Sequence, residues 1–222
     1  ELLITQKLKM KKVLKNVSFV ILLLKMCIIF GQETTAQKRI VIDVGHGGKD
    51  SGAIGINGIQ EKDVVLDVAN AILNLNNEMD KPLDIYLTRY SDTLISLSDR
   101  TKLAKALNAD LFVSLHCNHS DNPEASGIEV YSSKKQGEYS KESVFIGYQI
   151  EKVFCETIGY QSRGVKFANF QVLRETVEYC TSILLELGFL SNWDEGSYIL
   201  DNNNIERIAL SILISIKKSI KL

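Results

Sequence analysis

Three short segments of the sequence carry the residues that could do chemistry. VIDVGHGG (41–48), SLHCN (114–118) and LLELGFLSN (184–192) each run from apolar, strand-like residues directly into a His or a Glu. A Lewis-acid metal site needs a few nitrogen and oxygen ligands at the ends of rigid elements, with one coordination position left free. The three segments therefore predict the site of a zinc hydrolase.

Two imidazoles and one carboxylate form the predicted ligand set. His46 follows the first expected strand, His116 closes another, and Glu61 opens a helix after a Gly-rich loop. Such a set suits a zinc ion (Zn²⁺), with a water in the fourth position whose pKa falls toward about 7. Glu186 is expected to take the proton of that water and later to hand it to the departing amine, which an amide C–N bond requires.

Each of these residues also has a purely structural interpretation. A His at a strand end is often only hydrogen-bonded, and Glu61 at a helix start can simply favour the helix dipole. Glu186 is harder to explain in this way, because it is a lone charge in an apolar segment and an unpaired buried carboxylate is costly. His119, three residues after His116, is the competing imidazole. Cys117 alternates away from His116 and is expected to pack in the core.

The elements that must position these residues alternate between strand and helix. Short apolar or β-branched runs predict strands over residues 40–44, 84–88, 111–116, 128–131, 170–173 and 182–187. Apolar spacing of three and four predicts helices over residues 65–79, 103–107 with Ser98 as N-cap, 146–157 with a stop at Gly159, and 205–216. This alternation predicts an α/β fold: a single domain with a mostly parallel central sheet and helices on both faces. Ligands of such sheets collect at the carboxyl ends of the strands, where the predicted site residues lie.

Composition limits the number of domains and the class of partner. The 222 residues are 45% hydrophobic, which is enough for one well-buried domain but too short for two once a leader is subtracted. The net charge of -1 gives no basic stripe that would neutralise phosphates, so no nucleic-acid partner is expected.

The first 36 residues differ from the rest and are expected to be an upstream extension followed by a secretory signal peptide. Lysines cluster just after Met10, and residues 17–30 are apolar except for Lys25. This apolar run is shorter than the roughly 20 residues of a membrane-spanning helix, so a cleaved signal is favoured over a permanent anchor. We therefore expect an exported protein in the periplasm or cell envelope, with membrane contact only through an uncleaved signal segment.

The cysteines point to a domain without a disulfide framework. Cys27 would leave with the leader, and the odd count of Cys117, Cys155 and Cys180 permits at most one bridge. No CxxC pair that could form a zinc ribbon occurs in the sequence.

From about residue 39 onward, the chain resembles the zinc-dependent N-acetylmuramoyl-L-alanine amidases of bacteria, the amidase-3 family. The segments that carry the resemblance are VIDVGHGGKDSGAIG, GIQEKDVVLDVA, YLTRYSD, SLSDRTKLAKALNADLFVSLHCN, SGIEVY, RGVKFANFQVLRET and LLELGFLSN. The resemblance implies zinc ligands at His46, Glu61 and His116, a catalytic glutamate at Glu186, and a zinc amidase catalytic domain over residues 37–222. The implied reaction is hydrolysis of the amide between the lactyl group of N-acetylmuramic acid and L-alanine of the stem peptide in peptidoglycan.

The sequence does not decide which residues bind the substrate. Five polar residues of the motif segments could bind stem-peptide carboxylates or could belong to structural ion pairs: Arg89, Arg100, Asn118, Arg163 and Lys166. Two rival functions also remain, namely a zinc peptidase or other amidohydrolase acting on a different cell-wall amide, and a non-catalytic peptidoglycan-binding protein.

We also expect the site to be accessible to the substrate. Only one helical pattern lies between Tyr131 and Arg163. The interval thus leaves no room for the long inserted helix that blocks the site in relatives awaiting a partner protein. We expect an open site whose partner is peptidoglycan, with an activator or localisation protein as a second candidate partner.

Overall fold

The computed structural model describes residues 6–7, 10–13, 15–21 and 37–220. The chain divides into two compact units, Glu1–Ala36 and Gln37–Leu222. In the first unit, residues 10–13 and 15–21 are helical, whereas the cysteine and the Lys25 interruption expected in the leader lie outside the described residues. None of the described helices is both long enough and apolar enough to span a membrane.

The second unit is built around one six-stranded sheet with the strand order β2-β1-β3-β6-β4-β5. The strands are Arg39–Val44 (β1), Asp84–Leu87 (β2), Leu111–Asn118 (β3), Ile128–Ser133 (β4), Ser162–Ala168 (β5) and Thr181–Phe189 (β6). The first four strands in this order pair in parallel. β4 runs antiparallel to β6 and parallel to β5. The prediction of a mostly parallel sheet is confirmed.

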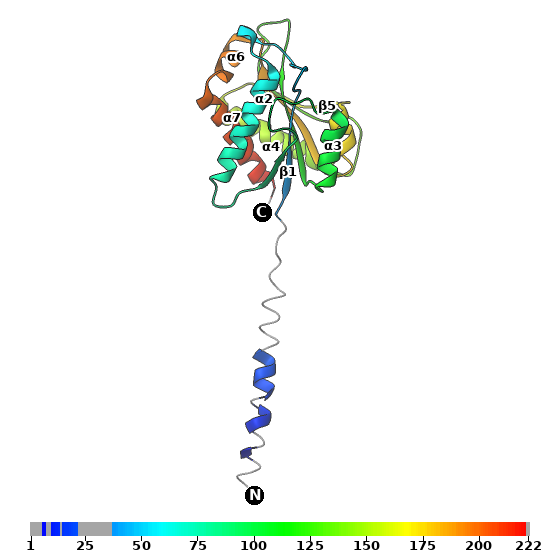
Figure 1. The fold of residues 1–222 in the computed structure, drawn as a ribbon, viewed down its shortest axis with the longest axis vertical. Helices are drawn as coiled ribbons and strands as arrows, with labels where there is room; N and C mark the ends of the chain where they lie inside the picture. Colours follow the sequence, from blue (N-terminus) through cyan, green and yellow to red (C-terminus); the bar gives the residue numbers. More distant parts are fainter. Residues whose placement is uncertain (1–5, 8–9, 14, 22–36, 221–222) are drawn as a thin grey trace. The chain divides into compact units, whose positions relative to one another are not determined.

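Helices cover both faces of this sheet, as predicted. One face packs against α2 (Glu61–Asn77), α4 (Ser140–Ile158) and α7 (Asn202–Ser219), and the other against α3 (Leu97–Ala106) and α5 (Gln171–Thr176). Figure 1 shows α2 and α7 on one side of the sheet and α3 on the other. The short helices η1 (Ile56–Gly58) and α6 (Trp193–Ile199) contact each other, and α6 also contacts β6 and α7.

The sheet has a large hydrophobic core on one face and a small one on the other, and the candidate site residue His116 points to the face with the small core. Successive side chains of a strand point to opposite faces. On β3, Val113 and Leu115 enter the large core beneath α2, α4 and α7, whereas Phe112 enters the small core beneath α3 and α5. His116 is four residues after Phe112, so its side chain points to the same face, the one covered by α3 and α5.

The structure corrects several of the predicted elements. Residues 170–173 are not a strand, because α5 begins at Gln171; a four-residue apolar run cannot by itself tell a strand from a helix. Strand β5 was not predicted, since it is an edge strand whose residues are exposed or half-buried and carry little apolar signal. Helix α6 was also missed.

Helix ends follow their capping residues. The predicted N-cap Ser98 is wrong: Ser96 caps α3, and its hydroxyl accepts from the Asp99 N–H at 3.1 Å. The Ser96 hydroxyl in turn donates to the Asp99 carboxylate, which fixes the orientation of the capping side chain. The stop at Gly159 is confirmed, with a left-handed φ of 86° at the end of α4. Cysteines 117, 155 and 180 are all free.

Candidate metal centre

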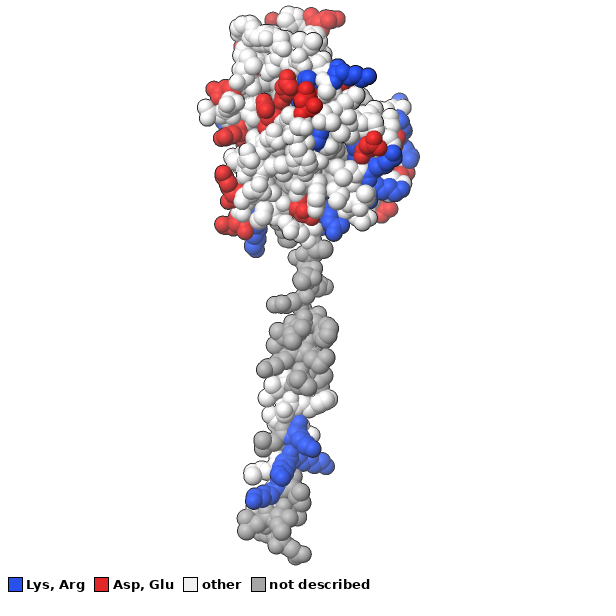
Figure 2. Space-filling model, in the orientation of Figure 1, with Lys and Arg blue, Asp and Glu red and all other residues white. Residues whose placement is uncertain are grey.

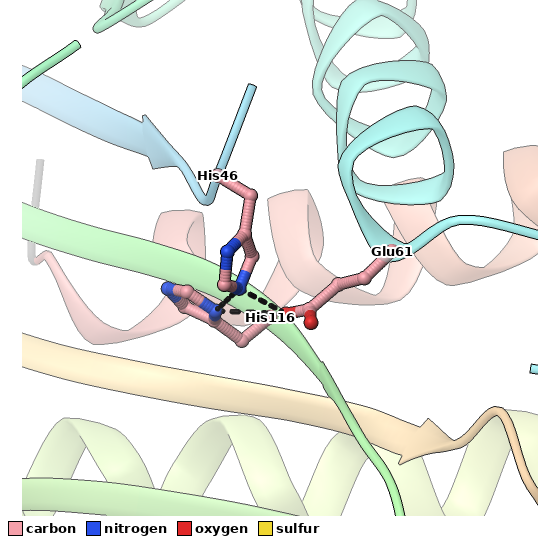
Figure 3. Close-up of side chains that lie close together, drawn as sticks. All are labelled: His46, Glu61 and His116. Atoms are coloured by element: carbon pink, nitrogen blue, oxygen red, sulfur yellow. Dashed lines mark hydrogen bonds and ion pairs between the residues drawn. The ribbon is translucent and has the colours of Figure 1, made fainter. Parts of the chain in front are cut away.

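Three side chains bring their ligand atoms together at the carboxyl edge of the sheet (Figure 3). His46 Nε2 lies 3.1 Å from Glu61 Oε1 and 3.2 Å from His116 Nδ1, and His116 Nδ1 lies 2.8 Å from Glu61 Oε1. Ligand bonds of about 2.0–2.1 Å in tetrahedral zinc sites separate neighbouring ligand atoms by roughly 3.3 Å. A triangle of nearly this size, made of two imidazoles and one carboxylate, fits a zinc-like cation with one position left open.

The turn after β1 sets the direction of the His46 ring. His46 has a left-handed φ of 55°, an uncommon conformation for a non-glycine residue that tends to occur at functional sites. Asp50 Oδ2 lies 2.9 Å from His46 Nδ1, which leaves Nε2 to face the other two ligand atoms. A Cβ on Gly45 would lie 2.6 Å from the His116 ring, so glycine at this position lets the second imidazole approach the turn.

Two buried arginines hold the backbone of the same turn. Arg100 donates to the His46 carbonyl at 2.8 Å and pairs with Asp43 at 2.7 Å. Arg89 donates to the Gly45 carbonyl at 2.8 Å. Both arginines are 3% exposed, and the protein itself accepts their hydrogen bonds. Of the two interpretations left open by the sequence, the structure therefore favours the structural one for this pair.

Glu61 enters the triangle from the first turn of α2, where it is almost fully buried. Its Oε1 accepts from the backbone N–H of Cys117 at 2.9 Å, and its Oε2 accepts from that of Ala53 at 2.8 Å. Burial raises the pKa of Glu61, but hydrogen bonds with His116 and His46 outweigh burial and hold it well below its usual range. Glu61 is therefore a fixed carboxylate anion between two imidazoles.

Glu186 lies beside the triangle. It is the direct cross-strand partner of His116 between β6 and β3. Its Oε2 is buried and has no hydrogen-bond partner among the described residues. Burial raises the pKa of Glu186 to about 7; the nearby charge of His116 opposes this, while the charges of Glu61 and Glu129 add to it. An unpartnered carboxyl with a pKa near neutrality can both accept and donate a proton.

The remaining candidates from the sequence fall into two groups. His119 is exposed and is not part of the triangle. Asn118, Arg163 and Lys166 all bind the same buried carboxylate, that of Glu129. As predicted, Cys117 points away from the triangle into the large core.

Two residues of the site were missed by the sequence reasoning. Glu129 is a lone charge in the apolar run SGIEVY, which is the same signal that singled out Glu186. Asp50 follows His46 by four residues in a Gly-rich turn, where it had no feature to distinguish it from an ordinary turn residue.

A cavity of about 700 Å³ lies next to the triangle, on the side of α3 and α5. His46, His116 and Glu186 line it, together with apolar side chains from the segments that precede α3 and α5. Leu94, Leu97 and Phe170 are each more than a third exposed. The triangle and Glu186 thus open onto a groove large enough for part of a polymer.

The fold and the site together define an α/β domain with a candidate metal centre at the carboxyl edge of its sheet. The chain belongs to the N-acetylmuramoyl-L-alanine amidase family (Amidase_3), whose profile matches residues 40–218. The resemblance to this family that was inferred from the motifs is thereby confirmed.

Individual relatives agree with this assignment. N-acetylmuramoyl-L-alanine amidase LytC of Bacillus subtilis (strain 168) is 38% identical over 162 residues, which are 72% of this chain and 31% of LytC. The chain thus spans about a third of the length of that relative. Among solved structures, the catalytic domain of CwlV, an N-acetylmuramoyl-L-alanine amidase from Bacillus (Paenibacillus) polymyxa var. colistinus, has a TM-score of 0.73 and 36% identity, covering 82% of this chain and 97% of that one.

A second solved structure contains a partner protein. The CwlD amidase from Clostridioides difficile, in complex with the GerS lipoprotein, has a TM-score of 0.74 and 26% identity, and the match covers 82% of this chain and 98% of that one.

Proposed function

We propose that this protein is a zinc-dependent N-acetylmuramoyl-L-alanine amidase. It hydrolyses the amide between the lactyl group of N-acetylmuramic acid and L-alanine of the stem peptide in peptidoglycan. The observation that carries the proposal is the triangle of His46, Glu61 and His116 with the unpartnered Glu186 beside it, in a chain of this family.

The ligand set supports zinc as the cofactor. His46 would bind through Nε2, with Asp50 fixing its ring, while His116 would bind through Nδ1 and Glu61 through Oε1. Two neutral imidazoles and one carboxylate leave a dication with a net charge of +1 and an open position, as in catalytic zinc sites. When bound, zinc would supply Lewis acidity, lowering the pKa of a water and polarising the amide carbonyl.

Glu186 is the general base and acid in this proposal. Its carboxylate takes a proton from the attacking water, and the resulting carboxyl delivers that proton to the amide nitrogen as the C–N bond breaks. The pKa of about 7 that burial gives this carboxyl suits both steps near neutral pH.

We further propose that the protein acts in the cell envelope. Residues 1–36 would be an upstream extension and signal peptide, and residues 37–222 the exported catalytic domain. The site is proposed to be open without an activator, because α4 is the only helix described between Tyr131 and Arg163. The side chains of His46 and His116 retain 23% and 20% exposure. The lipoprotein bound to CwlD makes a partner protein the alternative.

Mass spectrometry of the products from purified sacculi tests the proposed reaction. An amidase releases stem peptides with a free N-terminal L-alanine and leaves glycan strands that carry the lactyl carboxylate. A peptidase would instead release fragments cut within the stem, and a binding protein would sediment with sacculi without releasing products. Enzyme treated with a chelator is the control, and zinc is expected to restore its activity. Inertness of the isolated domain that a partner protein reverses would contradict the open site.

A further inference from the structure

A second charged cluster lies on the far side of Glu186 from the triangle. At its centre is Glu129 of β4, which is 4% exposed. Its Oε1 accepts from Arg163 Nε and from Lys166 Nζ, both at 2.6 Å. Its Oε2 accepts from Asn118 Nδ2 at 3.0 Å and from the Tyr131 hydroxyl at 2.7 Å. Both oxygens of the carboxylate are therefore fully used, and Glu129 serves as an anchor for two cations.

The two cations keep donors that the protein does not use. The side chains of Arg163 and Lys166 are 36% and 38% exposed. Among the described residues, Lys166 Nζ donates only to Glu129, and Arg163 Nη2 donates to none. The Arg163 guanidinium also lies over the Phe189 ring, 5.1 Å from its centroid, which restricts its orientation. Two cations against one carboxylate leave an excess of one positive charge with oriented, unfilled donors.

The sheet register places this cluster in line with the candidate metal centre. Glu186 of β6 is paired with His116 of β3 on one side and with Glu129 of β4 on the other. Neighbouring strands lie about 4.8 Å apart, so Glu129 is roughly 5 Å across the sheet from Glu186, the group that protonates the scissile nitrogen in the proposed reaction. A peptide covers at most about 3.3–3.6 Å per residue, so two residues span at most about 7 Å. A stem peptide that leads away from the scissile nitrogen along this line therefore reaches the two cations with its second residue.

We propose that Arg163 and Lys166, anchored by Glu129, form a binding site for the carboxylate on the second residue of the stem peptide. This inference rests on the function proposed above, and it gives the substrate a direction across the sheet. Arginine and lysine held beside a carboxylate ligand form charge-assisted hydrogen bonds, which are stronger than neutral ones. The site would thus select peptidoglycan in which that carboxylate is free over peptidoglycan in which it is an amide.

The experiment uses two soluble, uncrosslinked peptidoglycan strands that differ only at the second stem residue, which carries a carboxylate in one and a carboxamide in the other. Initial rates are measured for the wild type, for Lys166→Met and for Lys166→Met combined with Arg163→Gln. Lys135→Met is the matched control, because Lys135 pairs with Glu178 at the surface and has no contact with Glu129. In Lys166→Met, Glu129 keeps three of its four side-chain partners, so the fold is expected to persist.

The wild type is expected to have a lower KM for the carboxylate strand. Lys166→Met should raise that KM about tenfold, the loss of one hydrogen bond to a charged group, with kcat unchanged. Its KM for the carboxamide strand should stay within about twofold, and the double variant should no longer distinguish the strands.

Three results would overturn the inference. Equal losses on both strands would mean that the cations only neutralise Glu129. Equal cleavage of both strands by the wild type would mean that no carboxylate is recognised. If the wild type cleaves neither strand, the amidase proposal fails together with this inference, which distinguishes that failure from the other two.

Discussion

Two ionic networks flank the candidate metal centre, and they differ in how deeply their cations are buried. Asp43 and Arg100 are both almost fully buried, and Arg100 donates to backbone carbonyls of the turn that carries His46. Glu129 is buried as well, but its partners Arg163 and Lys166 remain more than a third exposed. A buried charge must be fully paired, whereas a half-exposed one can take a further ligand. The first network is therefore structural, and the second is available to substrate.

Figure 2 shows how the charged side chains are distributed on one face of the domain. Asp and Glu lie mostly on the left of this view and Lys and Arg mostly on the right, and neither sign covers the whole face. This agrees with the net charge of -1.

The largest effect is expected from breaking the buried network. Arg100→Met leaves the Asp43 carboxylate buried without its cation, so the free energy of unfolding should fall by about 3–5 kcal/mol. Urea denaturation measures this change. Adding Asp43→Asn to the same chain should recover part of the loss. An unchanged unfolding midpoint for Arg100→Met would contradict the structural role of this network.

A smaller effect is expected at the metal ligand that this network supports. Asp50→Ala removes the carboxylate that orients the His46 ring, which should weaken zinc affinity about 10–100-fold. Competition with a fluorescent chelator measures the affinity. Asp92→Ala is a suitable control, because Asp92 binds Lys62 and the Gly48 N–H but no ligand of the triangle. Equal losses in the two variants would show that Asp50 does not act through His46.

The pH dependence concerns Glu186, which lies between the two networks. Its active form as a base is the carboxylate, and burial raises its pKa to about 7. Acidification protonates Glu186, so kcat/KM should fall about tenfold for each pH unit below that pKa. A bound cation lowers the pKa of a neighbouring acid, so the midpoint in the zinc-loaded enzyme is expected at or below pH 7. A rate that increases on acidification from pH 7 to 5 would contradict this role.

The smallest effect is expected from the exposed network. Lys166→Met leaves Glu129 bonded to Arg163, Asn118 and Tyr131, so the free energy of unfolding should fall by no more than about 1 kcal/mol. Thermal unfolding of this variant beside Arg100→Met measures the difference directly. A loss as large as that of Arg100→Met would remove the distinction between the two networks.

The sequence was sufficient to predict the candidate metal centre because its residues lie at element ends. His46 and His116 follow runs that must be buried strands, and Glu61 begins a strongly periodic helix, so the parallel sheet brings all three to one edge. The same reasoning failed at β5 and α5, where short segments have no decisive periodicity. Tertiary contacts decide such segments: β5 pairs with β4, and α5 packs against α3 and β6.

The sequence also could not show which arginines are structural and which are free to bind a substrate. Arg100 and Arg163 are the same residue type in comparable motif segments. What distinguishes them is burial and the partner carboxylate, Asp43 for one and Glu129 for the other. Both depend on strands that are distant in the chain. Only the folded arrangement assigns one arginine to the backbone of a turn and leaves the other partly exposed.

The most direct test of the account measures zinc content and turnover of Glu186→Gln beside the wild type. Both proteins are expected to hold one equivalent of zinc, since Glu186 is outside the ligand triangle. Turnover of Glu186→Gln on peptidoglycan is expected to be about 10²–10⁴-fold lower than that of the wild type, the usual contribution of a general base. Loss of zinc together with activity would make Glu186 a ligand or a folding requirement, and full activity would exclude it as the base.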